Sequence, residues 1–324
     1  MKEYGGFLEL EKNTGREYHD GAVALNLARN CLRYLIKARN IKRIWLPRFL
    51  CKSVIVACQA EGITIEYYSI DETLRPVFGV FDLLSEGDYF YLVNYYGFLS
   101  NEEIKYYASR EPHIIVDNTQ AFFAEPLSGV DTIYTCRKYF GTPDGAYLYT
   151  DAELVDELPE DRSWDRMTHI LGRYEGNASD FYGKYRDNED ALINIPVMRM
   201  SSITHNLMRG IDYERAREYR VGNYAYLQEA FWEINQLAAS SCTQIGPFMY
   251  PMLVEHGAQL RKKLQAQKIY VPTLWSDVFE ICRPDELEYK LAENILPLPV
   301  DQRYGLEDMR YIEESVKACI AGEN

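Results

Sequence analysis

The amino-acid sequence predicts an α/β protein: a large domain with a mostly parallel sheet flanked by helices, plus a small C-terminal α+β domain. In the first half, short apolar runs rich in β-branched and aromatic residues alternate with stretches of helical periodicity. In the second half, one long helical stretch precedes shorter strand and helix patterns. Alternation of this kind is typical of parallel sheets covered by helices.

The first elements follow from periodicity and from residues that stop a helix or strand. Residues 22–39 carry apolar side chains at helical spacing, and the short apolar run 44–46 ends at Pro47. Residues 53–61 are helical up to Gly62. The remaining elements expected in this half are strands at 63–70, 89–93, 113–116, 132–135 and 146–149, and a helix at 101–109.

The second half begins with a polar, weakly periodic region at 160–200, followed by a long helical stretch at 201–233. The expected elements after it are strands at 248–254, 269–271 and 295–297 and helices at 257–267 and 306–321. We therefore expect a large domain over residues 1–200. Residues 201–324 would supply a connecting long helix and the small C-terminal domain.

Composition excludes several classes of protein. The formal net charge is −14 without a Lys/Arg-rich block, which argues against a nucleic acid or an anionic membrane as partner. No apolar run approaches the roughly 18 residues of a membrane helix. Seven scattered cysteines without CxxC spacing favour a reduced, cytoplasmic protein with neither a disulfide framework nor a zinc site. His205 and His256 are isolated, so we expect no metal centre.

Polar residues follow two neighbouring strands of the expected sheet. Asp117 ends the first, and Thr135 to Lys138 end the second, ahead of a Gly-containing turn at 141–145. In such folds the site lies at the carboxyl ends of the strands. Pyridoxal phosphate needs a buried carboxylate that keeps its ring nitrogen protonated and a lysine that binds its aldehyde, and Asp117 and Lys138 are suited to these two roles.

Each of these residues also has a simpler interpretation. A single Asp after a strand is most often a helix cap or turn residue, and a single loop lysine is usually a solvated surface charge. The arrangement is more informative than either residue: Asp-x-x-Gln-Ala follows one strand, and Thr-x-x-Lys with a Gly-containing turn follows the next.

These segments resemble the DegT/DnrJ family of pyridoxal-phosphate sugar aminotransferases, which have the aspartate-aminotransferase fold type. The family's Asp-x-x-Gln-Ala is matched by Asp117, Gln120 and Ala121, and its Ser-containing strand before the Schiff-base lysine is matched by Thr135 and Lys138. The likeness continues, in order along the chain, through segments 45–71, 93–98 and 291–316.

The resemblance implies an aminotransferase-like fold, pyridoxal phosphate as cofactor, and specific roles. Lys138 would form the Schiff base, Asp117 would pair with the pyridinium nitrogen, and Gln120 would donate to the phenolic oxygen of the ring. Thr135 would help hold the phosphate. By the same resemblance the amino donor would be glutamate, the keto acceptor a nucleotide-linked sugar or similar small molecule, and the protein a homodimer with shared active sites.

The sequence departs from the family pattern at two places in the expected cofactor site. The family's Ser-Gly-Thr at the start of the first helix is replaced around Ala28, Arg29 and Asn30. Here Arg29 either binds the phosphate by charge-assisted bonds or is a helix-surface charge. The aromatic residue that usually stacks on the cofactor ring falls on Cys51, with Phe49 close by, and we expect one of these two over the ring.

Two alternatives stay open on the sequence alone. One is a pyridoxal-phosphate lyase or dehydratase of the same fold, although the family's dehydratase branch has histidine in place of the lysine found here as Lys138. The other is a non-catalytic binding or scaffold relative, which the altered Arg29 and Cys51 positions favour and the retained Lys138 opposes. A dinucleotide-binding or P-loop domain is not indicated, because neither glycine pattern is present.

Overall fold

The structure is a computed structural model that describes residues 4–238 and 245–322. A seven-stranded sheet forms its centre, with strand order β1-β7-β6-β5-β4-β2-β3. The strands are β1 (Val23–Leu25), β2 (Arg43–Pro47), β3 (Thr64–Tyr68), β4 (Tyr89–Val93), β5 (Ile114–Asp117), β6 (Asp131–Thr135) and β7 (Ala146–Tyr149). Strands β2 to β6 run parallel, whereas β7 and β1 pair antiparallel at one edge. The predicted mostly parallel sheet is thus confirmed.

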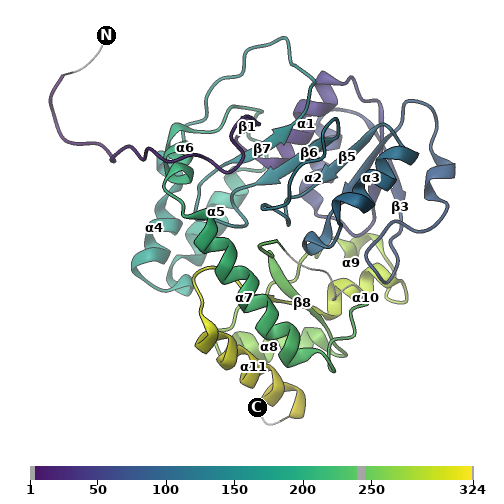
Figure 1. The fold of residues 1–324 in the computed structure, drawn as a ribbon, viewed down its shortest axis with the longest axis vertical. Coiled ribbons are helices and arrows are strands. Elements are labelled where there is room, and N and C mark those ends of the chain that lie inside the picture. Colours follow the sequence, from purple (N-terminus) through teal and green to yellow (C-terminus); the bar gives the residue numbers. More distant parts are fainter. Residues whose placement is uncertain (1–3, 239–244, 323–324) are drawn as a thin grey trace.

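Helices cover this sheet and form much of the second half of the chain (Figure 1). Helix α1 packs on β6 and β7, and α3 packs on β5. The helices are α1 (Ala28–Ala38), α2 (Lys52–Ala60), α3 (Asn101–Arg110), α4 (Thr168–Glu175), α5 (Tyr182–Ala191), α6 (Ser202–Arg209), α7 (Tyr213–Phe231), α8 (Gly257–Ala266), α9 (Val278–Ile281), α10 (Leu287–Asn294) and α11 (Leu306–Ala321).

The middle of the sheet is sealed from solvent on both faces. Every residue of β4, β5 and β6 is buried, which explains why β4 and most of β5 are continuous apolar runs without polar alternation. A polar side chain at the end of such a strand must find partners inside the protein. Asp117, the last residue of β5, is placed in this way.

A second, two-stranded sheet pairs β8 (Met249–Leu253) with β9 (Ile295–Pro299) in antiparallel register. Helix α7 packs against β8 and α11, and in Figure 1 these elements lie below the large sheet. The main apolar core extends through both parts, from Leu25 in β1 to Cys319 in α11. The division into domains 1–200 and 201–324 stays a proposal that rests on the two separate sheets.

Two sequence expectations in the second half are wrong. The single helix expected at 201–233 is two helices, because α6 ends at Gly210 and the carboxylate of Asp212 caps α7 by accepting from the Arg215 N–H at 3.0 Å. The expected strand at 269–271 is absent. Ile269 and Val271 are buried, but β8 and β9 pair with each other, so residues 269–271 have no neighbouring strand to pair with.

The polar region 160–200 contains the short helices α4 and α5, which the weak periodicity did not indicate. Within residues 4–238 and 245–322, none of the helices is both long enough and apolar enough to cross a bilayer.

Candidate active site

Asp117 lies buried at the carboxyl end of β5, next to the neighbouring strand β4. Its Oδ2 accepts a hydrogen bond from the Tyr91 hydroxyl at 3.0 Å, and its Oδ1 accepts one from the Thr119 N–H at 2.8 Å. The surrounding protein, and then the Asp117 charge, raise the pKa of Tyr91, so this phenol stays a donor. With one donor on each oxygen, the carboxylate keeps lone pairs for a further donor.

Lys138 follows β6 and directs its amine toward the Asp117 segment. Its Nζ donates to the Thr119 hydroxyl at 2.8 Å and lies 5.8 Å from the centre of the Phe248 ring. Although the residue as a whole is exposed, surrounding atoms desolvate the amine and lower its pKa, while the Asp117 carboxylate acts in the opposite direction. The amine therefore gives up its proton more readily than an ordinary lysine does.

The turn after Lys138 requires a glycine at one position. Gly145 has φ +116°, and a Cβ there would lie 2.8 Å from Thr204 Cγ2 and 3.0 Å from Cys136 Sγ. The Gly145 carbonyl accepts from the Thr135 hydroxyl at 3.3 Å. Thr135, expected to hold a phosphate, is thus a buried residue whose hydroxyl proton is engaged within the turn, and donation to a phosphate requires this hydroxyl to turn away from Gly145.

Gln120 is buried three residues after Asp117. Its Oε1 accepts from the backbone N–H of Tyr96 at 2.7 Å, and Tyr96 has φ 54°, a left-handed conformation that is uncommon for a non-glycine residue. The bond therefore fixes a strained turn and leaves the amide nitrogen of Gln120 as the donor expected from the sequence.

At the amino-terminal end of α1, the backbone N–H groups of Ala28 and Arg29 have no acceptor among the described residues, whereas that of Asn30 donates to the Leu27 carbonyl at 3.0 Å. Leu27 is the capping residue and provides no side-chain cap, and the first turn contains no acidic residue. Arg29 lies in this turn and makes no hydrogen bond or ion pair with the described part of the chain. Burial lowers the pKa of Arg29, and repulsion by Arg137 adds to this effect, against the opposing charge of Glu189. An anion would relieve this arrangement.

Asn30, the third residue of this turn, has a structural role in the fold. Its amide donates to the side chain of Asn26 at 2.9 Å and to the Pro196 carbonyl at 2.9 Å. The side chain is therefore committed to holding the segment before α6, and only the backbone of the residue belongs to the helix end.

The two candidates for stacking on a cofactor ring have different surroundings. Cys51 is exposed and close enough to Lys138 and Arg29 to interact electrostatically with both. Phe49 is fully buried, with its ring 4.4 Å from that of Trp275. Of the two, Cys51 is the one that interacts electrostatically with the Lys138 amine.

Two residues of this network were not among those expected from the sequence. Tyr91 is one of several aromatic residues in a buried strand, and Thr119 is a hydroxyl in a loop; neither carries a local signal of its role.

Arg137, next to Lys138, forms an ion pair with Glu189 of α5, and its Nε lacks a partner among the described residues. This ion pair brings the α4–α5 region beside the site.

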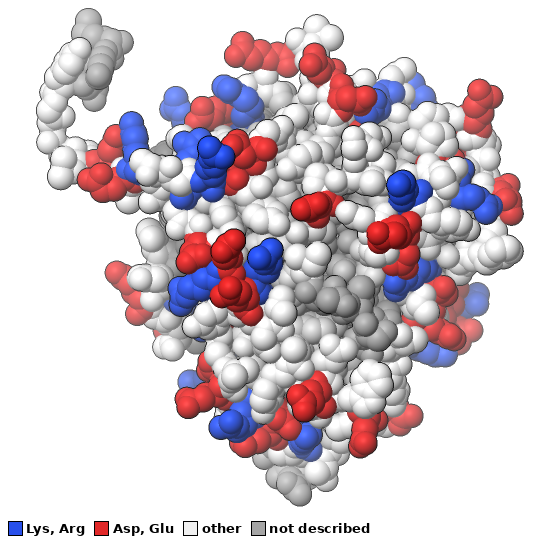
Figure 2. All heavy atoms as spheres, in the orientation of Figure 1, with Lys and Arg blue, Asp and Glu red and all other residues white. Residues whose placement is uncertain are grey.

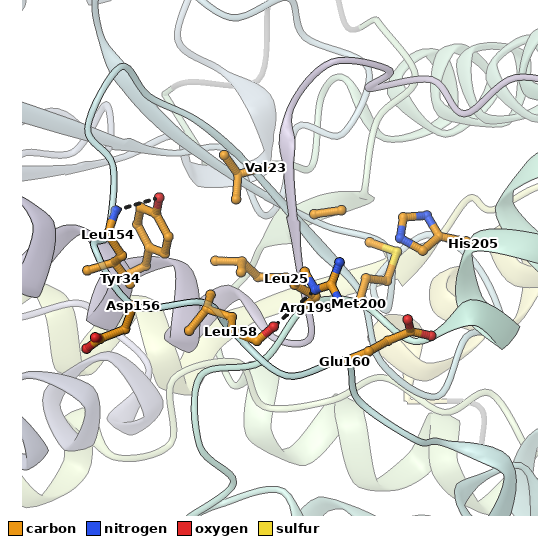
Figure 3. Close-up of a pocket in the computed structure, with 11 residues that line it drawn as sticks. Val23, Leu25, Tyr34, Leu154, Asp156, Leu158, Glu160, Arg199, Met200 and His205 are labelled. Carbon is orange, nitrogen blue, oxygen red and sulfur yellow. Dashed lines mark hydrogen bonds between the residues drawn. The ribbon is translucent and has the colours of Figure 1, made fainter.

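A separate cavity of about 330 Å³ lies at the β1 edge of the sheet (Figure 3). Its walls combine apolar residues of β1 with Leu154 and Leu158, and Arg199 and His205 reach it from the segment around α6. Asp117, Thr119 and Lys138 do not line it, so we place the chemistry at the amine and carboxylate instead of at this cavity. The face drawn in Figure 2 carries acidic and basic side chains intermixed, without a broad basic field.

Comparison with known proteins identifies the fold. No family model and no curated protein matches the sequence. Among solved structures, a DegT DnrJ EryC1 StrS aminotransferase from Brucella abortus is 14% identical with a TM-score of 0.63, and the match covers 92% of this chain and 85% of that chain. The sugar aminotransferase CalS13 from Micromonospora echinospora is 16% identical with a TM-score of 0.63, covering 92% and 87%. The PLP form of Spr1654 from Streptococcus pneumoniae is 14% identical with a TM-score of 0.65, covering 92% and 86%.

This chain has the fold of these aminotransferases. The match extends over nearly the whole chain and agrees with the resemblance seen in the sequence. At these identities it is the fold that is established, and activity must be argued from the residues.

Proposed function

We propose that this protein is a pyridoxal-phosphate-dependent aminotransferase, in which Lys138 binds the cofactor and Asp117 pairs with its ring nitrogen. One observation carries the proposal: a desolvated amine and a buried carboxylate, from the ends of adjacent strands, are joined through Thr119. The fold shared with aminotransferases, one of them solved in its PLP form, supports the same conclusion.

The residues present fit this cofactor. Asp117 has acceptor capacity left for a protonated ring nitrogen, since only one donor engages each of its oxygens. Arg29 and the uncapped first turn of α1 have donors available for a phosphate. We propose that Arg29 and the backbone N–H groups of Ala28 and Arg29 provide this phosphate site, with the Thr135 hydroxyl turning from Gly145 toward the phosphate when it is bound.

Pyridoxal phosphate supplies an electron sink for the pair of electrons left when a substrate carbon loses its proton. The chain's own residues do the rest. Asp117 keeps the ring nitrogen protonated, and Tyr91 holds that carboxylate in place. The amine of Lys138, whose pKa is lowered by the desolvation of its surroundings, takes and returns a proton more readily than an ordinary lysine.

We further propose a sugar-derived keto acceptor and glutamate as the amino donor. The fold shared with the sugar aminotransferase CalS13 supports the acceptor class. Glutamate as donor is proposed from the resemblance of the sequence to the DegT/DnrJ family.

The test is whether Lys138 carries the cofactor. Purified protein incubated with pyridoxal phosphate is expected to become yellow, and borohydride reduction followed by peptide mapping should place the added mass on the Lys138 peptide. Lys138→Ala should lose the label, and Asp117→Asn should keep the fold but bind the cofactor about 10- to 100-fold more weakly, through loss of a charge-assisted bond. A label on another lysine would overturn the site assignment.

Glutamate alone separates the reaction classes. An aminotransferase should convert the bound cofactor to its amine form and release 2-oxoglutarate, whereas a lyase or dehydratase should leave the cofactor spectrum unchanged. Absence of any label with excess cofactor would favour the non-catalytic alternative.

A further inference from the structure

The backbone carbonyl of Tyr139, the residue after Lys138, accepts two side-chain hydrogen bonds from the C-terminal half of the chain. Arg220 Nη2 of α7 donates at 3.1 Å, and Gln302 Nε2, just after β9, donates at 2.8 Å. The Tyr139 phenol in turn donates to the Gln120 carbonyl at 2.7 Å, in the segment that follows Asp117. Tyr139 is therefore held at both ends, with Lys138 beside it.

Arg220 donates hydrogen bonds to neutral acceptors from three segments of the chain. Its Nε donates to Gln302 Oε1 at 2.7 Å, and its Nη1 donates to the carbonyls of Pro247 at 2.9 Å and Phe248 at 3.2 Å. The guanidinium also lies 4.4 Å from the centre of the Tyr139 ring, a cation–π arrangement. Only 1% of the residue is exposed, and among the described residues it has no carboxylate within ion-pair distance.

A buried guanidinium without an ion pair raises the free energy of the folded protein. Removing a guanidinium from water costs several kcal/mol, and in Arg220 no ion pair returns that energy. Burial accordingly lowers the pKa of Arg220. An apolar side chain would fill the same space without this cost. An apolar residue cannot bind the Tyr139 carbonyl, Gln302 and the two residues that precede β8 together.

We propose that Arg220 and Gln302 are positioning residues that hold the Lys138 loop in place from the C-terminal half of the chain, which rests on the role proposed above for Lys138. The contacts of Tyr139 carry this inference. Through its carbonyl and its phenol, Tyr139 fixes the loop relative to α7 and relative to the Gln120 segment. The amine of Lys138 is thereby kept among desolvating atoms and within reach of Thr119.

Loss of either side chain therefore has a defined chemical effect. A loop that is no longer anchored exposes the amine further to water, so that the pKa of Lys138 rises toward that of an ordinary lysine. A purely structural role would lower stability and leave the amine unchanged.

The experiment follows Lys138 in the full-length protein without cofactor. Trace acetylation at a series of pH values, read by mass spectrometry of the Lys138 peptide, gives the midpoint at which the amine becomes reactive. Arg220→Met and Gln302→Met remove the donors and keep apolar volume. Arg39→Met is the matched control: it removes bonds of 2.9 and 2.8 Å from a partly buried arginine to Asp131, at the opposite end of β6.

We expect Arg220→Met and Gln302→Met to raise the midpoint and to slow acetylation of Lys138 at pH 8 about threefold or more, because each unit of pKa changes the free-amine fraction about tenfold. Arg39→Met should lower the thermal unfolding temperature but leave the midpoint unchanged. If the Arg220 and Gln302 variants behave like Arg39→Met, the positioning role is refuted.

Gln302→Met keeps the proposal testable if Arg220→Met does not fold, since Gln302 is only partly buried. The measurement is also independent of the cofactor. A shifted midpoint in a protein that never binds pyridoxal phosphate would support the positioning role and count against the proposed enzyme.

Discussion

The hydroxyl of Thr119 accepts a 2.8 Å hydrogen bond from the amine of Lys138, although the two residues follow different strands of the sheet. The backbone N–H of the same threonine donates to Asp117 at 2.8 Å. One residue thus touches both charged groups of the site and fixes their relative position. A substitution at Thr119 should therefore directly alter the surroundings of the Lys138 amine.

Thr119→Val is expected to lower the pKa of Lys138 further, because it removes an acceptor that favours the charged ammonium and keeps the volume of the side chain. In protein without cofactor, acetylation of Lys138 at neutral pH should become faster. Thr119→Ser, which retains the hydroxyl, is the control and should resemble the parent protein. Equal rates in all three proteins would mean that the hydrogen bond has no influence on the amine.

Arg29→Met should weaken binding of pyridoxal phosphate about 10- to 100-fold, the usual effect of losing one charge-assisted bond of about 1.5–3 kcal/mol. Pyridoxal, which lacks the phosphate, should bind both proteins alike. Absorbance titration with the two ligands measures this difference, and Arg29→Lys should fall between parent and Met variant. An equal loss for both ligands would show that Arg29 acts on the fold and not on the phosphate.

The buried His19 is expected to make the folded protein less stable in mild acid. Its Nε2 donates to the Phe122 carbonyl at 2.8 Å, and burial lowers its pKa from 6.5 to about 4. Between pH 6.5 and about pH 4, His19 therefore binds a proton in the unfolded chain but not in the folded protein. The stability contribution is complete above pH 6.5, decreases as the pH falls, and is lost near pH 4, a change of about 3 kcal/mol.

His19→Gln tests this prediction, since its amide can still donate to Phe122 but does not titrate. Urea unfolding at pH 7 and pH 4.5 should give a smaller drop in the free energy of unfolding for the variant than for the parent. Other groups titrate in both proteins and cancel in the comparison. Parallel pH profiles would exclude His19 as the source.

A homodimer is expected from the apolar surface of the 164–193 region, where Trp164 is 72% and Tyr174 is 91% exposed. Light scattering at micromolar concentration should give twice the mass of one chain. The double variant Tyr174→Glu with Tyr182→Glu should shift the protein toward the monomer without a matching loss of secondary structure by circular dichroism. A monomeric parent with cofactor bound would contradict the prediction.

The sequence predicted best what local pattern controls. The helix expected at 306–321 coincides with α11, and the strands expected at 89–93 and 146–149 coincide with β4 and β7. It predicted less well what depends on a distant partner. Ile269 and Val271 have the composition of a strand, but strand formation needs a neighbour, and β8 and β9 already use each other. The end of α6 at Gly210 was masked by periodicity on both sides.

The same distinction holds in the site. Asp117 and Lys138 were identified because each ends an apolar strand, and their roles stay predictions until tested. Thr119, Tyr91 and Arg220 are recognised only in three dimensions: Arg220 lies 81 residues from Tyr139 along the chain, and no spacing rule joins them. Arg29 was left between two interpretations, and the absence of a protein partner in the described residues favours the phosphate.

The contacts on the Tyr139 carbonyl also set an order of assembly during synthesis. The large sheet is complete once β7 has been made, whereas Arg220 follows much later and Gln302 later still. All seven strands of the sheet are therefore synthesised while the lysine loop still lacks two of its anchors. The reactive amine reaches its final environment only after translation has passed β9, so a truncated chain that ends before Gln302 lacks part of the support of its lysine loop.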